Sequence, residues 1–328
     1  MTAPSTPPGE PLARAAGAPA LYSALGAIFH LEILEPDDEP RLERAVELAY
    51  GWFGEHLRWT RRSGDVWISR FRPQDLEYIP CYVRDLDEPA VADPSLQIFA
   101  ANLAKVGRMD HEVACNGAEV EGDASPYLLR FDAEIPEVGR GPRFQPYAVL
   151  KLCVPDAWPL DDFRERVMAI AAALRLRWGA AGLTYASWDL QEYQVSHDRV
   201  YAHARRHPGY DVGYYEADME LWYDEIRSIS WLTFLGPSIA TRLEEARGPL
   251  QGSPLVSVSR AGSAVCLQAG EAPEAGDVNR LIYPRAYVEA DALVRPVRAA
   301  DGRPFVFLGR WTEATLTDWL RRFERRMS

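Results

Sequence analysis

Apolar residues recur at spacings of four, three and four positions in two stretches of the chain. This period places them on one face of a helix, as in a helix packed against a core. They are Leu42, Val46, Ala49 and Phe53 in the stretch 38–56, and Phe163, Val167, Ile170 and Leu174 in the stretch that begins at Asp161. We therefore predict a helix with one buried face in each stretch.

Strand patterns lie between these two predicted helices. Apolar and charged positions alternate over residues 129–135, which is typical of a half-buried strand, and the apolar run 147–154 is its more buried neighbour. Residues 66–71 and 78–83 are further strand candidates, while the mostly apolar residues 21–34 fit either a strand or a short buried helix. Because these strands follow one another without long helices between them, we predict antiparallel pairing.

The second half of the chain repeats this mixture. Its predicted elements are a helix at 188–207, a buried strand at 229–235 that contains Trp231, a helix at 237–246, strands at 255–259 and 264–268, a largely helical segment at 278–294, a short strand at 304–309 and a C-terminal helix. We expect Thr312 to cap that last helix, which would bury Leu316, Trp319, Leu320 and Phe323. The predicted class is α+β, with a mixed, largely antiparallel sheet packed with amphipathic helices.

The domain organisation is expected to be simple. Residues 1–20 are rich in Pro, Ala and Gly and predict a disordered tail without a secretion signal, and residues 21–328 predict one compact domain. The triplet Leu-Arg-Trp follows both of the first two predicted helices, at 57–59 and at 176–178. This repetition leaves open an internal duplication with halves 21–155 and 156–328.

Charge and cysteine content narrow the function classes. The formal net charge is -12, which argues against a nucleic-acid partner or an anionic membrane partner, since both require a basic surface. The four cysteines have no paired spacing, which favours reduced thiols in a cytoplasmic protein. No apolar stretch reaches the roughly 20 residues that span a membrane.

The sequence offers little catalytic or metal-binding chemistry. His203 and His207 are four residues apart and would share a helix face, but Ala204 stands where a zincin helix carries glutamate, so we expect no metal and no other cofactor. The common nucleophile, phosphate and dinucleotide motifs are missing. A hydrolase or nucleotide-modifying enzyme that uses unplaced carboxylates stays open as an alternative.

The stretch 209–236 combines acidic and aromatic residues with the apolar strand. Within it, the acidic segment 210–225 carries tyrosines, a tryptophan and six carboxylates, and Arg227 is the only basic residue of the stretch. Aromatic side chains supply binding energy and carboxylates steer a basic partner, so the segment is a candidate docking surface. The candidate contact residues are Asp211, Tyr214, Tyr215, Glu216, Asp218, Glu220, Trp222, Asp224 and Glu225. Alternatively, the aromatic residues pack inward and the acids form an ordinary solvated face.

Four motifs in the C-terminal half carry a family resemblance. They are HPGYDV at 207–212, ISWLTFLG at 229–236, CLQAGEAPEAGDVNR at 266–280 and YPRAYVEADALVRPVR at 283–298. On these motifs the chain resembles the type VI secretion immunity proteins, over about residues 20–300.

That resemblance implies an antidote rather than an enzyme. Such a protein binds a cognate secreted toxin and protects the producing cell, and the resemblance implies a nuclease toxin that acts in the cytoplasm. The partner would then present a basic surface to the acidic segment. An adaptor that loads the toxin onto the secretion apparatus is a further alternative, and the family supplies no catalytic residues to carry over.

Overall fold

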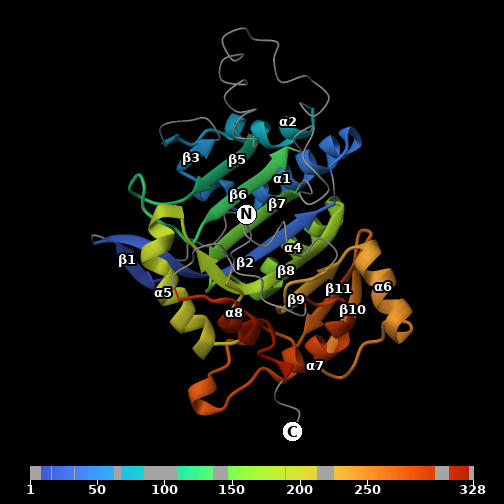
Figure 1. Ribbon diagram of the computed structural model, residues 1–328. Helices are drawn as coiled ribbons and strands as arrows, with labels where there is room; N and C mark the ends of the chain where they lie inside the picture. Colours follow the sequence, from blue (N-terminus) through green and yellow to red (C-terminus); the bar gives the residue numbers. More distant parts are fainter. Residues whose placement is uncertain are drawn as a thin grey trace.

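The computed structural model describes residues 9–15, 17–32, 34–62, 68–84, 109–135, 147–188, 190–212, 225–299 and 310–324. One large sheet crosses this part of the molecule (Figure 1). Its strands are β1 (Ala13–Ala15), β2 (Ala18–Leu31), β3 (Trp59–Arg62), β4 (Ser69–Arg70), β5 (Met109–Asn116), β6 (Leu128–Ile135), β7 (Tyr147–Pro155), β8 (Leu176–Ala186), β9 (Leu232–Leu235), β10 (Val256–Ala261) and β11 (Ala264–Ala269). They lie in the order β10-β11-β9-β8-β2-β7-β6-β5-β3-β4, with β1 paired to β2.

Neighbouring strands of the sheet pair antiparallel along this whole path. Both the predicted class, α+β, and the predicted antiparallel pairing are therefore confirmed. The strands of both proposed halves belong to the same sheet, while the internal duplication itself stays a prediction.

Strand β2 is the middle of this sheet. It pairs with β7 on one side and with β8 on the other, so the apolar segment that begins at Leu21 is a strand as far as Leu31 and not a helix. Gly26 lies opposite Gly182, and a Cβ at Gly26 would stand 2.5 Å from Thr184 Cγ2 and 2.8 Å from Leu152 O. Only glycine fits at this point, because the neighbouring strands approach too closely for any side chain.

The described helices of α type are amphipathic and cover the sheet. They are α1 (Glu39–Phe53), α2 (Tyr78–Arg84), α4 (Leu160–Ala173), α5 (Leu190–Arg206), α6 (Pro237–Arg247), α7 (Arg285–Val294) and α8 (Glu313–Leu320). Helices α1 and α4 lie side by side behind the sheet in the view of Figure 1. The two apolar faces predicted from the helical spacing meet there, since α1 buries Leu42 and Phe53 while α4 buries Phe163 and Val167.

Helices α5 and α8 form a second apolar cluster on the nearer side of the sheet (Figure 1). Val200 and Ala204 of α5 pack there with Leu316, Trp319 and Leu320 of α8. As predicted, Thr312 caps α8, and its hydroxyl accepts a hydrogen bond from Thr315 N at 3.2 Å. The acidic segment begins beside this cluster, because Tyr210 and Val212 belong to it.

Three expectations need correction. Residues 78–83 are helix rather than strand, because Leu76, Ile79 and Val83 have helical spacing and all three are buried. Part of the tail expected to be disordered forms β1 and the start of β2. Strand β6 is buried on both faces, and its Arg130 is neutralised by Asp132 at 3.0 Å.

The remaining predicted elements agree in type, with shifted ends. Only the last part of the predicted strand 66–71 is described as β4, and the segment 278–294 contains a 3-10 turn (Val278–Arg280) before α7. The predicted strand at 304–309 lies outside the described residues.

Trp231, expected to be a core residue, is 1 % exposed. Its ring stacks on Phe163, with centroids 6.3 Å apart, and its Nε1 donates a hydrogen bond to Gly270 O at 3.2 Å. Trp231 therefore joins α4 to the start of β9 and to the turn after β11.

We predict that Trp231→Ala lowers the free energy of unfolding by about 3–5 kcal/mol, because it empties a buried aromatic site. Urea unfolding of the purified variant measures this loss. Tyr50→Ala is the control, because it removes an aromatic ring that is 38 % exposed on α1 and should cost far less. Equal stability of the Trp231 variant and the wild type would contradict the assignment.

Candidate functional site

The acidic segment leaves the sheet at a fixed point. Asp211 N donates a hydrogen bond to Leu183 O at 2.9 Å, and Thr184 Oγ1 donates one to Asp211 O at 3.1 Å. One residue earlier, the Tyr210 hydroxyl lies 2.9 Å from Ser23 Oγ. The chain is thus attached to β8 and β2 directly before residues 213–224, which lie outside the described residues.

The segment returns at an equally fixed point. Ile226 N donates a hydrogen bond to Val297 O, and Ala299 N donates one to Ile226 O, each at 2.9 Å. These bonds attach the returning chain to the backbone that follows α7.

A buried ion pair joins the two ends of the segment. Arg227 Nη2 donates to Asp211 Oδ1, and the two residues are 0 % and 5 % exposed. Arg227 also lies over the Trp178 ring, 5.9 Å from its centroid. Burying two charges is compensated only when they pair closely, so this contact holds residues 211 and 227 together.

Arg227 was missed as a structural residue by the sequence analysis. Its signal was nevertheless present, since a single arginine among six carboxylates stands directly before the apolar strand. A lone base in that position is best explained as the internal partner of one of those acids.

The structure places only two of the nine candidate contact residues. Asp211 is buried and paired, so it is not part of an exposed docking surface, contrary to our expectation. Glu225 is partly exposed at the returning end. The other seven lie outside the described residues: Tyr214, Tyr215, Glu216, Asp218, Glu220, Trp222 and Asp224.

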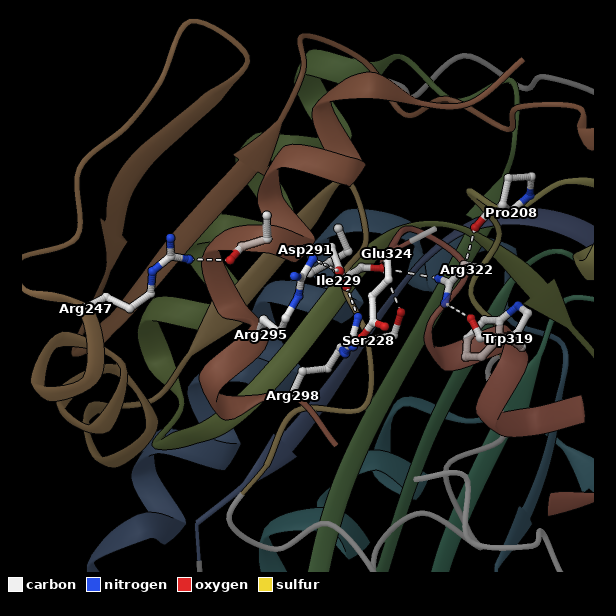
Figure 2. Close-up of polar contacts among 11 residues, drawn as sticks. Pro208, Ser228, Ile229, Arg247, Asp291, Arg295, Arg298, Trp319, Arg322 and Glu324 are labelled. Carbon is white, nitrogen blue, oxygen red and sulfur yellow. Dashed lines mark hydrogen bonds and ion pairs between the residues drawn. The ribbon is translucent and has the colours of Figure 1, made fainter. Parts of the chain in front are cut away.

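A network of arginines holds the surrounding elements together (Figure 2). Arg298 donates to both Asp291 of α7 and Glu324 beyond α8. Asp291 is 1 % exposed, and its burial raises its pKa while the neighbouring Arg298 opposes that rise. The network therefore ties α7 to the end of α8.

Arg322 extends the same network toward the start of the acidic segment. It donates to Pro208 O at 2.6 Å and to Trp319 O at 3.0 Å, as Figure 2 shows. Burial lowers the pKa of Arg322 to about 9, although the nearby carboxylates of Asp211 and Asp291 act to raise it. The guanidinium of Arg322 therefore points inward to backbone carbonyls.

His203 of α5 and His207, directly after that helix, are partly buried and hydrogen-bonded within the chain. His203 Nδ1 lies 2.9 Å from the Tyr185 hydroxyl, and His207 Nδ1 lies 2.7 Å from Gly276 O. Burial, assisted by His207 and two arginines, lowers the pKa of His203 to about 4. Within the described parts of the chain, no group of three or more His, Cys, Asp or Glu residues is placed to hold a metal ion.

The buried thiols are unreactive at neutral pH. Burial raises the pKa of Cys115 to about 12, that of Cys153 to about 11 and that of Cys266 to about 12. A thiol with such a pKa stays protonated, and the protonated form is a poor nucleophile.

The family comparison decides how this arrangement is interpreted. A family described as TsiV, type VI immunity for VRR-NUC, matches residues 41–323. The chain belongs to the TsiV family. It is accordingly a type VI immunity protein, of a family named for protection against VRR-NUC nuclease toxins.

A solved structure shares the fold of this TsiV protein. It is the Pseudomonas aeruginosa type VI secretion protein PA0821, with a TM-score of 0.67 and 18 % sequence identity. The similarity covers 93 % of this chain and 82 % of that one. A comparison with curated proteins gives no match. In the portion described here, no helix has the length and apolar character needed to cross a membrane.

We predict that Asp211→Ala lowers the free energy of unfolding by about 3–5 kcal/mol, because it leaves the Arg227 charge buried without its carboxylate. The double variant Asp211→Ala, Arg227→Met should recover a large part of that loss, since neither charge of the pair then remains. Denaturant unfolding of the two single variants and the double variant gives the coupling energy. Additive effects would show that the two side chains do not interact.

Proposed function

We propose that this TsiV protein neutralises a cognate VRR-NUC toxin by binding it stoichiometrically, with residues 213–225 of the acidic segment as the contact surface. The observation that carries the proposal is the family match over residues 41–323. It supports binding to a nuclease toxin rather than an enzymatic activity of this chain.

The buried ion pair supports the choice of surface. Asp211 and Arg227 bring the ends of the segment together, so the twelve residues 213–224 start and finish at one place on the molecule. Anchoring both ends reduces the conformational freedom that the segment loses on binding.

The charge of the segment supports the choice of partner. Residues 213–225 contain five carboxylates and no lysine or arginine. A nuclease holds phosphates on a basic surface, so an array of carboxylates is complementary to it and competes with nucleic acid. With nucleic acid as the substrate of the toxin, the cytoplasm is the compartment where protection is required.

Reversing charges in the segment should slow toxin association. We predict that Glu216→Arg, Asp218→Arg and Glu220→Arg together reduce the association rate strongly and weaken its dependence on salt, because carboxylates act by steering. The measurement is binding kinetics with the cognate VRR-NUC toxin across salt concentrations. A melting temperature near the wild-type value would show that the variant is folded and that the slower association comes from the reversed charges.

A control for net charge is available on the other side of the sheet. Glu43, Glu47 and Glu165 are exposed on α1 and α4, and their reversal to Arg changes the net charge equally. This control should keep most of the association rate. Equal slowing in both variants would show that only the net charge matters, and unchanged kinetics in the first would exclude the segment.

Removing the aromatic side chains of the segment should change the dissociation rate rather than the association rate. We predict that Tyr214→Ala, Tyr215→Ala and Trp222→Ala each speed dissociation, because an aromatic anchor contributes roughly 2 kcal/mol or more when it is a hot spot. Tyr50→Ala on α1 is the matched control for loss of an exposed ring. Dissociation rates equal to the wild type would mean that these rings face the protein interior.

A further inference from the structure

A hollow of about 210 Å³ opens between the ends of α5 and α8, two helices that pack together on the nearer side of the sheet in Figure 1. We call it the arginine hollow. The side chains that line it and that matter here are Arg205 of α5, Trp319, Arg321 and Arg322 at the end of α8, and Val278 of the turn 277–282. None of them belongs to the contact surface proposed above.

The lining of the hollow carries more positive than negative charge. Three guanidinium groups line it, and Asp318 supplies the one carboxylate of its described lining. Charges farther away on this acidic protein are largely screened, because the Debye length is about 8 Å at physiological salt. The local excess therefore suits the hollow to an anion.

Arg322 lies in the hollow with uncharged partners. Its Nε donates to Pro208 O at 2.6 Å and its Nη1 to Trp319 O at 3.0 Å, as Figure 2 shows, and its Nη2 lies 3.5 Å from Ile229 O. Its Cζ is 3.8 Å from the centroid of the Trp319 ring. These partners in the described chain do not neutralise the guanidinium, so an anion beside it would offset the burial that lowers its pKa.

Arg205 is exposed in the last turn of α5. Its Nη1 donates to the Tyr201 hydroxyl at 2.6 Å, and its guanidinium lies over that ring, 5.3 Å from the centroid. Arginines near a helix C-terminus commonly bind the last carbonyl groups of the helix. Arg205 is held by a side-chain hydroxyl instead, so capping of α5 does not explain its place beside the hollow.

Trp319 brings an unused hydrogen-bond donor to the same place. It is 3 % exposed, it lines the hollow, and its Nε1 has no hydrogen-bond partner among the described residues. A buried N–H group without an acceptor is costly. Because Arg322 stacks on this ring, an acceptor that reached Trp319 Nε1 would also lie near a guanidinium, and the oxygen of an anion meets both requirements.

The turn 277–282 forms a firmly held wall of the hollow, to which it contributes Val278. Arg206 Nη2 lies 2.9 Å from Asp277 Oδ2, and this ion pair fixes the start of the turn to α5. At its other end Leu281 is 78 % exposed and keeps a left-handed backbone with φ 59°, which is unfavourable for a leucine. The turn and α5 therefore supply preorganised walls, which reduces the entropy that binding costs.

We propose that the arginine hollow binds a phosphate monoester group. Such a group carries about -1.5 to -2 charges at pH 7 and several strong acceptor oxygens, which matches three guanidinium groups less the carboxylate of Asp318. A single carboxylate group would neutralise only one of these charges. The hollow is smaller than the roughly 300–1,000 Å³ of pockets for drug-sized ligands, so the ligand is inorganic phosphate or a small organic phosphate. This site goes beyond the antidote function and does not depend on the toxin.

The test measures binding of inorganic phosphate, glycerol phosphate and adenosine monophosphate to the full chain by calorimetry, at constant ionic strength and with acetate as the monovalent comparison. Arg205→Gln and Arg321→Gln each remove one positive charge, and Trp319→Phe removes the Nε1–H group while it keeps an aromatic ring. We expect each variant to weaken phosphate binding about tenfold or more, because each removes a charge or a donor from the group that is bound. Melting curves show that each variant is folded.

Arg44→Gln is the matched control. Arg44 is exposed on α1, and its substitution removes the same charge at a distance from the hollow. Its affinity for phosphate should equal that of the wild type.

The probes identify the source of the phosphate group. Tighter binding of either organic phosphate than of inorganic phosphate would support a small organic ligand, and equal binding would support inorganic phosphate.

Four results would overturn the proposal: no binding of any phosphate compound by the wild type, acetate bound as tightly as phosphate, unchanged affinity in all three hollow variants, or equal weakening in the Arg44 control. If no phosphate compound binds and the Arg205 and Arg321 variants bind the toxin more weakly, the hollow instead receives carboxylates of the toxin. Failure of the wild type to bind the toxin would overturn the antidote function and leave a phosphate site standing.

Discussion

The ion pair between Asp211 and Arg227 serves both the fold of this protein and the position of its proposed contact surface. Each charge loses several kcal/mol of hydration on burial, and only a close partner compensates that loss. The pair therefore forms only if Asp211, in the sequence motif HPGYDV, and Arg227, two residues before ISWLTFLG, come together. Its geometry fixes where the intervening acidic residues emerge, so the position of the proposed contact surface is a consequence of folding.

Other arginines in the second half of the chain hold the elements that surround this ion pair. Arg298 and Arg322 reach carboxylates and backbone carbonyls from α7, α8 and the chain around residue 208, and they enclose the same region (Figure 2). Guanidinium groups suit this role, because several donors in a fixed plane satisfy several acceptors at once. Lysine is nearly absent from the chain, and the Lys151 side chain is buried and donates a hydrogen bond to Tyr185 O at 3.1 Å. The scarcity of lysine agrees with this use of arginine.

The sequence analysis succeeded where the spacing of apolar residues fitted only one type of secondary structure. The paired helices α1 and α4 and the buried face of α8 were predicted from spacing, because one apolar face leaves a single solution. Burial of Trp231 was predicted from the apolar run that surrounds it. It failed at 78–83, where a seven-residue helix is too short for its period to stand out. It also failed at Asp211, since the composition of an acidic run does not reveal which carboxylate finds a buried arginine; that pairing depends on residues far apart in the fold.

The exposed Leu281 follows a different logic from the buried charges. Buried Asp211 is explained by its partner within the chain, whereas Leu281 is strained, apolar and without a core to fill. Strain that folding does not require persists only when the surrounding structure enforces it, and here Arg206 and Asp277 enforce it. An antidote has to accept one toxin and reject others, and apolar surfaces discriminate by shape whereas carboxylates discriminate by charge. In complexes of this type, charge sets the rate of encounter while shape sets the lifetime of the complex.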